Sequence, residues 1–284
     1  MEIINRRQRM FSIARKLRRE NKTVAFVPTM GALHDGHIAL VKEARQSSDV
    51  VIVSIFVNPA QFNDKEDLDR YPRDITADSA LLAQYGVDYV FAPEEHEIYP
   101  QGFSTNVYVE GVSEGLEGSA RPGHFRGVAT IVAILFNTVR PDKAFFGEKD
   151  AQQVAVIKRM TADLGFETEI VVVPTVREES GFAMSSRNEN LTAEEREKAA
   201  VINRALGEAK AAFENGERNA SNLTEIVRNM IEGEPLARID YVSTVNAETL
   251  EPLDTIEDTG ALIAAAVFFG KVRLIDNVRL NAKQ

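Results

Sequence analysis

Short apolar runs alternate with helical patterns along the first 174 residues. Runs rich in β-branched and aromatic residues predict strands, namely TVAFVP (23–28), DVVIVSIFVN (49–58), VDYVFAP (87–93), DKAFF (142–146) and TEIVVVP (168–174). Helical periodicity predicts helices at about 37–47, 74–85, 126–139 and 150–164. Apolar strands that alternate with helices are typical of a parallel sheet covered on both faces. The pattern therefore predicts an α/β fold with a doubly wound parallel sheet.

The pattern changes after Pro174. An irregular stretch at 177–190 precedes a long helical pattern, in which Thr192 and Glu195 have the spacing of a capping box. A second helix is expected at about 221–232, and strand-like runs follow at 237–245, 260–270 and 272–280. We therefore predict two domains, a catalytic domain at 1–175 and a smaller C-terminal α+β lid domain at 176–284.

The chain begins with a charged segment, MEIINRRQRMFSIARKLRREN, that lacks the apolar core of a secretory signal. It is interpreted as an amphipathic helix whose basic residues either form a solvated face or bind phosphate or a membrane surface. The net charge of −10 favours the solvated face. No apolar run approaches the length of a membrane span. We therefore expect a soluble, globular, cytoplasmic protein with no membrane partner.

Two features of the composition exclude whole classes of function. A pI near 5.1 disfavours nucleic acid as a partner, because an acidic surface repels the phosphate backbone. The absence of cysteine excludes disulfides, thiolate catalysis and thiolate metal sites.

Half of the four histidines lie in PTMGALHDGH, between the first apolar run and its helix. Gly31 and Gly36 allow a ligand to approach the backbone, and a helix that begins near His37 directs free N–H groups at the same place. His34 and His37 could donate hydrogen bonds to phosphate oxygens there. The alternatives are polar surface and a metal site, and the spacing of the two histidines does not match the zincin pattern. The pattern favours phosphate binding.

Polar residues also follow the later strands, where ligands bind in parallel sheets. Asn58 and Gln61 could orient a small polar substrate or form an ordinary Asn-Pro turn. Lys149 could hold a phosphate, and Asp150 could bind ribose or, with Gln153, only cap the next helix. Side chains with open roles, as carboxylate or phosphate anchors or as exposed loop residues, are Tyr71, Arg73, Arg121, His124 and Arg126. The run AMSSRN, with two hydroxyls and an arginine, is suited to closing over a polyphosphate.

Several motifs together resemble a known family. PTMGALHDGH resembles the H-x-G-H signature of the nucleotidyltransferase superfamily related to class I aminoacyl-tRNA synthetases, and MSSRN resembles its mobile K-M-S-K-S loop. More narrowly, FVNPAQF, RYPRD, SARPGHFRGV, FFGEKDAQQ and SSRN, in this order, resemble the pantothenate synthetase (pantoate:β-alanine ligase) family. The resemblance extends over nearly all of the chain and implies a Rossmann-like nucleotidyltransferase fold.

The resemblance implies a ligase that works in two steps. ATP and pantoate would give pantoyl adenylate and pyrophosphate, and β-alanine would then attack the acyl carbon to give pantothenate and AMP. Mg²⁺ would be held mainly by the phosphates, and the protein would form a homodimer. By position, the residues implied for ATP are Met30, Gly31, Ala32, Leu33, His34, Asp35, Gly36, His37, Gly147, Glu148, Lys149, Asp150, Val176, Met184, Ser185, Ser186 and Arg187. Those for pantoate are Gln61 and Gln153, with Asn58 as a further candidate, and the catalytic groups are His37, His34 and Lys149.

Three other functions fit parts of the sequence. Another adenylyl or cytidylyl transferase on this fold would keep the nucleotide on its product. A tRNA-charging fragment would need a basic surface, which the acidic composition disfavours. A nucleotide-binding regulator would bind ATP without turnover.

Overall fold

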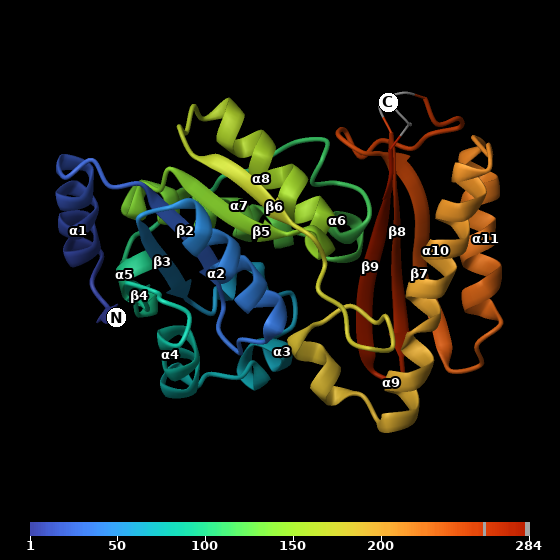
Figure 1. Cartoon of the computed structure of the whole chain (residues 1–284), viewed down its shortest axis with the longest axis horizontal. Coiled ribbons are helices and arrows are strands. Elements are labelled where there is room, and N and C mark those ends of the chain that lie inside the picture. The colour runs from blue at the N-terminus through green and yellow to red at the C-terminus, as the bar shows by residue number, and fades with distance from the viewer. Residues whose placement is uncertain (258–259, 282–284) are drawn as a thin grey trace.

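The computed structural model describes residues 1–257 and 260–281 and contains two sheets side by side (Figure 1). The larger sheet has six parallel strands in the order β1-β4-β3-β2-β5-β6. They are β1 (Glu2–Ile4), β2 (Val24–Thr29), β3 (Val50–Ile55), β4 (Tyr89–Phe91), β5 (Lys143–Gly147) and β6 (Glu169–Val173). The direction of chain progression reverses at β2, which pairs with β3 on one side and β5 on the other. The predicted doubly wound sheet is confirmed.

Helices cover both faces of this sheet, as apolar strands require. They are α1 (Arg7–Arg19), α2 (Asp35–Ser47), α3 (Lys65–Arg70), α4 (Ile75–Ala83), α5 (Glu95–Ile98), α6 (Glu117–Ala120), α7 (His124–Val139) and α8 (Ala151–Asp163). Along β2, Phe26 joins the core formed with α1, α7 and α8, whereas Ala25 and Val27 join the core formed with α2 and α4. Alternate side chains of the strand thus serve opposite layers.

The second sheet is antiparallel, with the order β7-β8-β9. Its strands are β7 (Ala237–Asn246), β8 (Ala261–Phe269) and β9 (Val272–Leu280), and its helices are α9 (Ala193–Ala199), α10 (Val201–Glu214) and α11 (Ala220–Glu232). The predicted Thr192–Glu195 capping box is confirmed. The single long helix expected after it is wrong, because a turn at Ala200, with φ −59° and ψ −16°, divides it into α9 and α10. The short elements β1, α3, α5 and α6 were not predicted.

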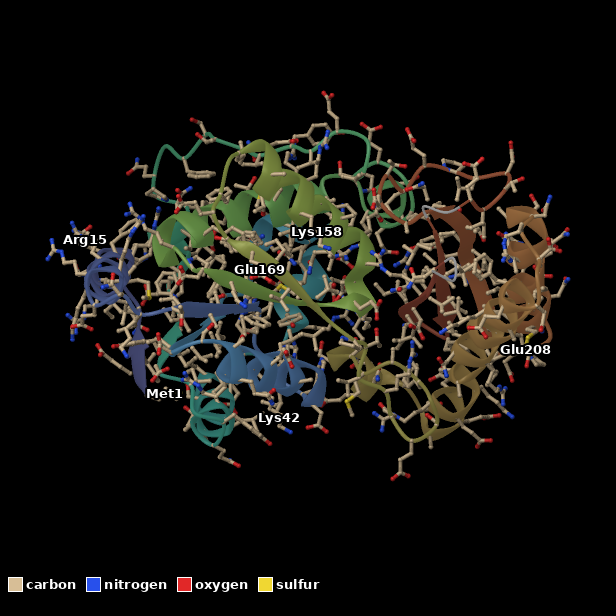
Figure 2. All side chains as sticks on the ribbon, turned by 45° about the horizontal axis from the view of Figure 1, so that its top comes forward. Met1, Arg15, Lys42, Lys158, Glu169 and Glu208 are labelled. Atoms are coloured by element: carbon tan, nitrogen blue, oxygen red, sulfur yellow. The ribbon has the colours of Figure 1, made fainter. Side chains whose placement is uncertain are left out.

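Side chains of α6 and α8 pack against the second sheet where the two parts of the chain meet. Ala151 of α8 shares a buried cluster with Val245, Leu262 and Ala264 of the second sheet. Beside this cluster, Arg273 of β9 forms two hydrogen bonds to the buried carboxylate of Glu117, at 2.7 and 2.8 Å. Figure 2 shows the labelled charged side chains of Arg15 and Glu208 toward opposite ends of the molecule, away from this contact. A domain boundary near residue 175 stays a prediction.

The N-terminal helix α1 carries the basic residues that could have formed an anion patch. Basic residues of this segment pair with acidic side chains, as Arg6, just before the helix, does with Glu97 at 2.9 Å and Arg9 does with Glu2 at 3.3 Å. Within residues 1–257 and 260–281, no helix combines the length and the apolar character that crossing a membrane requires.

Candidate active site

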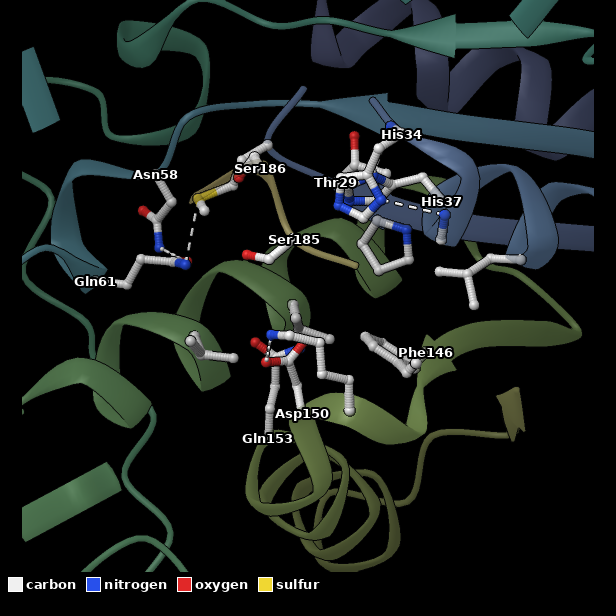
Figure 3. Close-up of a pocket in the computed structure, with 18 of the residues that line it drawn as sticks. Thr29, His34, His37, Asn58, Gln61, Phe146, Asp150, Gln153, Ser185 and Ser186 are labelled. Carbon is white, nitrogen blue, oxygen red and sulfur yellow. Dashed lines mark hydrogen bonds and ion pairs between the residues drawn. The ribbon is translucent and has the colours of Figure 1, made fainter. Parts of the chain in front are cut away.

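A cavity of about 250 Å³ opens at the carboxyl ends of β2 and β5, where the strand order reverses (Figure 3). Ligands of open α/β sheets bind at such a switch point, because the loops after the two strands diverge there. The loops after β2, β3, β5 and β6 all contribute to its lining. The polar residues that follow the strands in sequence are thereby brought to one place.

His34 and His37 line the cavity at the start of α2. The amide of Gly36 donates to Nδ1 of His34 at 3.1 Å, and the amide of His34 donates to Nδ1 of His37 at 3.3 Å. Each Nδ1 is therefore an acceptor, so in the neutral ring the hydrogen is on Nε2. The rings lie 4.2 Å apart between centroids. The two histidines thus form the helix cap and also present two N–H donors beside the positive end of the α2 dipole.

The surroundings of both histidines favour the neutral ring. Burial and then the neighbouring His34 lower the pKa of His37 from 6.5 to about 3. Burial and then the charge of Lys149 lower the pKa of His34. Both rings are therefore neutral at pH 7 and donate hydrogen bonds without carrying charge.

A buried carboxylate shapes the turn before His34, and no sequence pattern indicated it. Asp78 of α4 accepts hydrogen bonds from the amides of Ala32 and Leu33, at 3.1 and 2.9 Å. Gly31 has φ +84°, and a Cβ there would lie 2.8 Å from Asp78 Oδ2. The turn therefore needs glycine at this position, and two of its amides are already satisfied by the protein.

Asn58 and Gln61 lie on the wall formed after β3. The Asn58 side chain is buried, accepts from the hydroxyl of Tyr99 at 2.6 Å and donates from Nδ2 to Gln61 Oε1 at 2.9 Å. Because Gln61 Oε1 is occupied, its Nε2 is the end that is directed toward Met30 Sδ, at 3.3 Å. Gln61 is thus oriented as a donor, so it suits a ligand oxygen.

The main chain of Gln61 is held by two residues of the RPGHFRG loop. His124 Nδ1 donates to the carbonyl of Gln61 at 2.8 Å, and Arg121 Nη2 donates to the same carbonyl at 3.4 Å. Nε2 of His124 lies 3.3 Å from Arg121 Nη1, which fits a neutral ring that accepts there. Burial and then the charge of Arg121 lower the pKa of His124 to about 4. Within the described residues, Arg121 has no carboxylate within 4.0 Å, although it lines the cavity.

Lys149, Asp150 and Gln153 line the cavity after β5. Figure 3 shows Asp150 and Gln153 on the wall across from Asn58 and Gln61. The ammonium of Lys149 lies 3.5 Å from a carboxylate oxygen of Asp150. Asp150 precedes α8 without a side-chain capping bond, so the interpretation of Asp150 and Gln153 as a capping box is wrong. Both side chains instead face the cavity, on the side across from Ser185.

The segment after β6 forms another side of the cavity. Met184, Ser185, Ser186 and Arg187 all line it, as does Val176. Ser185 accepts from the amide of Arg187 at 3.3 Å and begins a short 3₁₀ turn, Ser186–Asn190. Arg187 reaches Asp67 at 3.4 Å, so the segment contacts α3 across the opening.

Most of the expected site residues are brought together. Those that line the cavity are Met30, His34, Gly36, His37, Asn58, Gln61, Tyr71, Arg121, His124, Gly147, Lys149, Asp150, Gln153, Val176, Met184, Ser185, Ser186 and Arg187. Those that do not are Gly31, Ala32, Leu33, Asp35, Arg73, Arg126 and Glu148. Sequence reasoning missed the apolar wall, which includes Phe56, Phe62, Val128, Ile131, Val132, Leu135 and Phe146. The sequence of α7 did indicate such a wall, because its apolar residues are nearly continuous and cover more of the helix than one buried face requires.

Within the described residues, no group of three histidine or acidic side chains could hold a metal ion. The polar groups of the cavity are mostly N–H donors and hydroxyls, and its one carboxylate, Asp150, lies 3.5 Å from the ammonium of Lys149. This set suits a ligand rich in anionic oxygens.

Comparisons with known proteins give consistent results over the full length. The family model described as Pantoate-beta-alanine ligase matches residues 2–279. The pantothenate synthetase of Caldicellulosiruptor bescii is 50% identical over 283 residues, which cover 100% of both chains. That of Heliobacterium modesticaldum is 52% identical over 278 residues, 98% of this chain and 99% of the relative.

Solved structures agree with the sequence matches. Pantothenate synthetase from Thermus thermophilus superposes with a TM-score of 0.92 at 46% identity, covering 99% of this chain and 100% of the other. Pantoate-beta-alanine ligase from Francisella tularensis, described as complexed with beta-gamma ATP and beta-alanine, gives a TM-score of 0.79 at 38% identity. That match covers 98% of this chain and 97% of the other.

Proposed function

The chain belongs to the pantoate-beta-alanine ligase family, and from this premise we infer that its cavity forms pantothenate from pantoate and β-alanine with ATP. The reaction makes an amide bond, so the protein is a ligase. The observation that carries the assignment to this cavity is the convergence of His34, His37, Lys149 and Gln61 at the switch point of the sheet.

The first step proposed is attack by the pantoate carboxylate on the α-phosphorus of ATP, which releases pyrophosphate. Such a step needs no protein nucleophile, because the substrate supplies it, and it depends on positioning and on stabilising charge on the phosphate oxygens. The Nε2–H groups of His34 and His37 and the ammonium of Lys149 are donors of this kind. Because both imidazoles are neutral, they act as hydrogen-bond donors and need not transfer a proton.

Pantoate is proposed to lie between Gln61 and Gln153 and against the apolar wall. Its hydroxyl and carboxylate oxygens match the Nε2 donor of Gln61, which Asn58 orients. Its two methyl groups match Val128, Ile131 and Phe146. Asn58 would then act on the substrate through Gln61, because its own polar atoms already have protein partners.

The carboxylate of β-alanine requires a cation, and we assign Arg121 to it. The guanidinium lines the cavity, is held beside the carbonyl of Gln61 and has no ion pair within 4.0 Å in the described part of the chain. A carboxylate bound there leaves the amine of β-alanine free to attack the acyl carbon. The bond between the acyl carbon and the phosphate oxygen breaks as the amide forms, and AMP leaves.

The triphosphate is proposed to lie between Lys149 and the segment from Met184 to Arg187, with the adenine near Val176 and the ribose near Asp150. Closing this segment would keep water from the acyl adenylate. A magnesium ion would bind together with the triphosphate and be held mainly by its oxygens, because the described residues contain no group of three histidine or acidic side chains that could hold a metal ion. The remaining residues implied for ATP would then support the backbone around the ATP site without contacting the nucleotide. They are Gly31, Ala32, Leu33, Asp35 and Glu148.

Product analysis tests the proposal. The protein is incubated with ATP, magnesium, pantoate and β-alanine, and the products are separated and identified by mass. Equal amounts of AMP, pyrophosphate and pantothenate are expected, and omitting any substrate should abolish pantothenate. A product that retains the nucleotide would indicate a different transferase, and ATP binding without any product would indicate a regulator.

The homodimer and the cytoplasmic location remain proposals. The family resemblance supports the first, and the second is supported by ATP as a substrate and by a chain without cysteine. Light scattering coupled to size exclusion would measure the oligomeric state directly.

A further inference from the structure

A residue of the second sheet holds the backbone of the turn that carries Lys149. Asn277, on β9, is 7% exposed. Its Nδ2 donates to the carbonyl of Glu148 at 3.1 Å and to the carbonyl of Lys149 at 2.9 Å. An amide NH₂ has two hydrogens, and both are used here. Only the nitrogen end can donate to a carbonyl, so the chemistry fixes the orientation of the amide.

The other side-chain contacts of the turn are longer, namely the ion pairs of Lys149 with Asp150 at 3.5 Å and of Glu148 with Arg279 at 3.9 Å. The turn itself is a single 3₁₀ turn, Glu148–Asp150, between the end of β5 and the start of α8. Gly147 has no side chain with which to cap the turn, and the Asp150 side chain makes no capping bond to α8. The position of the Lys149 backbone therefore depends on partners from outside the turn, and β9 is the strand of the second sheet that faces it (Figure 1).

The residue next to Asn277 secures the other segment at the triphosphate. Asp276 forms two hydrogen bonds with Arg177, at 2.6 and 3.0 Å, and it is buried. It also accepts from the amide of Asn277 at 2.8 Å, which ties the two residues together. Arg177 precedes Met184–Arg187 in the chain. Two adjacent residues of β9 therefore hold both the start of this segment and the turn that carries Lys149.

We propose that Asn277 is a positioning residue for Lys149, through which the second sheet contributes to binding of the triphosphate without touching it. This inference rests on the function proposed above for Lys149. A long lysine side chain has many rotamers, and fixing its Cα and peptide plane reduces the entropy lost when it binds phosphate. Without the two hydrogen bonds, the ammonium of Lys149 would still be present, but its backbone would no longer hold it in position for the phosphate.

A double-mutant cycle tests the proposal. Asn277→Leu removes both donors at similar size, and Lys149→Ala removes the group it would position. Binding of ATP in the presence of magnesium is measured by calorimetry, with no turnover, for the native chain, each variant and the double variant. We expect Asn277→Leu to weaken ATP binding about tenfold in the native chain and less than about twofold when Lys149 is already alanine. Equal loss in both backgrounds, or no loss in the native chain, would overturn the proposal.

Two further variants separate positioning from stability. Asn277→Asp keeps the side-chain size and replaces the donor by a carboxylate facing two carbonyls, so the same cycle made with it should give the same coupling. Asn222→Leu is the matched control, because Asn222 also donates from Nδ2, to Glu217 at 2.8 Å, on the exposed side of α11. It should leave ATP binding unchanged. If the native chain bound ATP and gave the expected coupling but formed no pyrophosphate with pantoate, the proposed function would fail and the positioning role would stand.

Discussion

The backbone amide of His34 donates to the side chain of His37, so the two histidines of the H-x-G-H motif are fixed as a pair before any ligand binds. Because His34 Nδ1 accepts from Gly36 in the same turn, both rings present Nε2–H to the cavity. A spacing of three residues across a glycine therefore serves the helix cap and the phosphate site at once.

This pairing predicts different effects for two substitutions. His37→Ala should lower turnover by at least ~10²-fold, because one donor to the transition-state phosphate is lost. His34→Asn should also lower turnover, but it should leave α2 as stable as before, because asparagine is a good N-cap residue. Turnover and urea unfolding are measured for both variants. Normal turnover in a folded His37→Ala protein would remove His37 from the mechanism.

The lowered pKa values predict that acid destabilises the fold. An unfolded histidine, with a pKa near 6.5, takes up a proton as the pH falls from 7 to 5, whereas folded His37 and His124, with pKa values of about 3 and about 4, do not. The unfolded state then binds more protons, so the free energy of unfolding falls as the pH falls. Each histidine accounts for at most about 2 kcal/mol over this range. Urea unfolding at pH 7, 6 and 5 measures the slope.

The control for this slope is His124→Gln. Carboxylates such as Glu97, whose pKa is lowered by hydrogen bonds from Arg7 and Arg6, stay ionised in the folded protein over this range and contribute little. The variant should therefore lose less stability between pH 7 and 5 than the native chain. If the loss of stability between pH 7 and 5 were the same in the variant as in the native chain, His124 would take up a proton over this range in the folded state as it does in the unfolded state.

Substitution of Arg121 should separate the two half-reactions. Arg121→Gln should raise the KM for β-alanine by about 10- to 100-fold, the size expected for a lost charge-assisted hydrogen bond. Pyrophosphate exchange with pantoate alone should change little. Arg126→Gln, on an exposed side chain of the same motif that does not line the cavity, is the control and should behave as the native chain. A loss confined to pyrophosphate exchange would assign Arg121 to ATP or pantoate instead.

Gly127 allows α7 to approach the Gln61 turn closely. A Cβ at this position would lie 2.3 Å from the carbonyl oxygen of Ala60 and 2.7 Å from the amide nitrogen of Gln61. Gly127→Ala should therefore lower the free energy of unfolding by about 1–3 kcal/mol and raise the KM for pantoate. Gly207→Ala, in α10 with nothing within 4 Å of its added Cβ, should be neutral or stabilising. Equal behaviour of the two variants would contradict a tight contact at Gln61.

The sheet and the rim of the cavity were predictable because they depend on local signals. Apolar runs such as 49–58 contain the buried strand β3, and glycine and histidine after β2 mark the loop at its carboxyl end. Parallel strands place their carboxyl ends at one edge, so Gln61 and Lys149 could be assigned to the same rim without coordinates.

Long-range contacts could not be predicted in this way. Asp78 is in an ordinary helix start, and nothing local indicates that it accepts the amides of Ala32 and Leu33. Asn277 is one of several polar residues in a strand that also carries Arg273, Asp276 and Arg279, and its partners are 128 and 129 positions away. The capping-box spacing of Asp150 and Gln153 was misleading, because sequence spacing cannot distinguish a side chain that turns back to the helix from one that faces a cavity.

Pyrophosphate exchange detects formation of the acyl adenylate separately from the second half-reaction. Labelled pyrophosphate is incubated with the protein, ATP, magnesium and pantoate, with β-alanine left out, and label in ATP is measured. We expect exchange that requires pantoate and falls at least ~10²-fold in Lys149→Ala. Absence of exchange from folded protein that binds ATP would contradict an acyl adenylate formed between His34, His37 and Lys149.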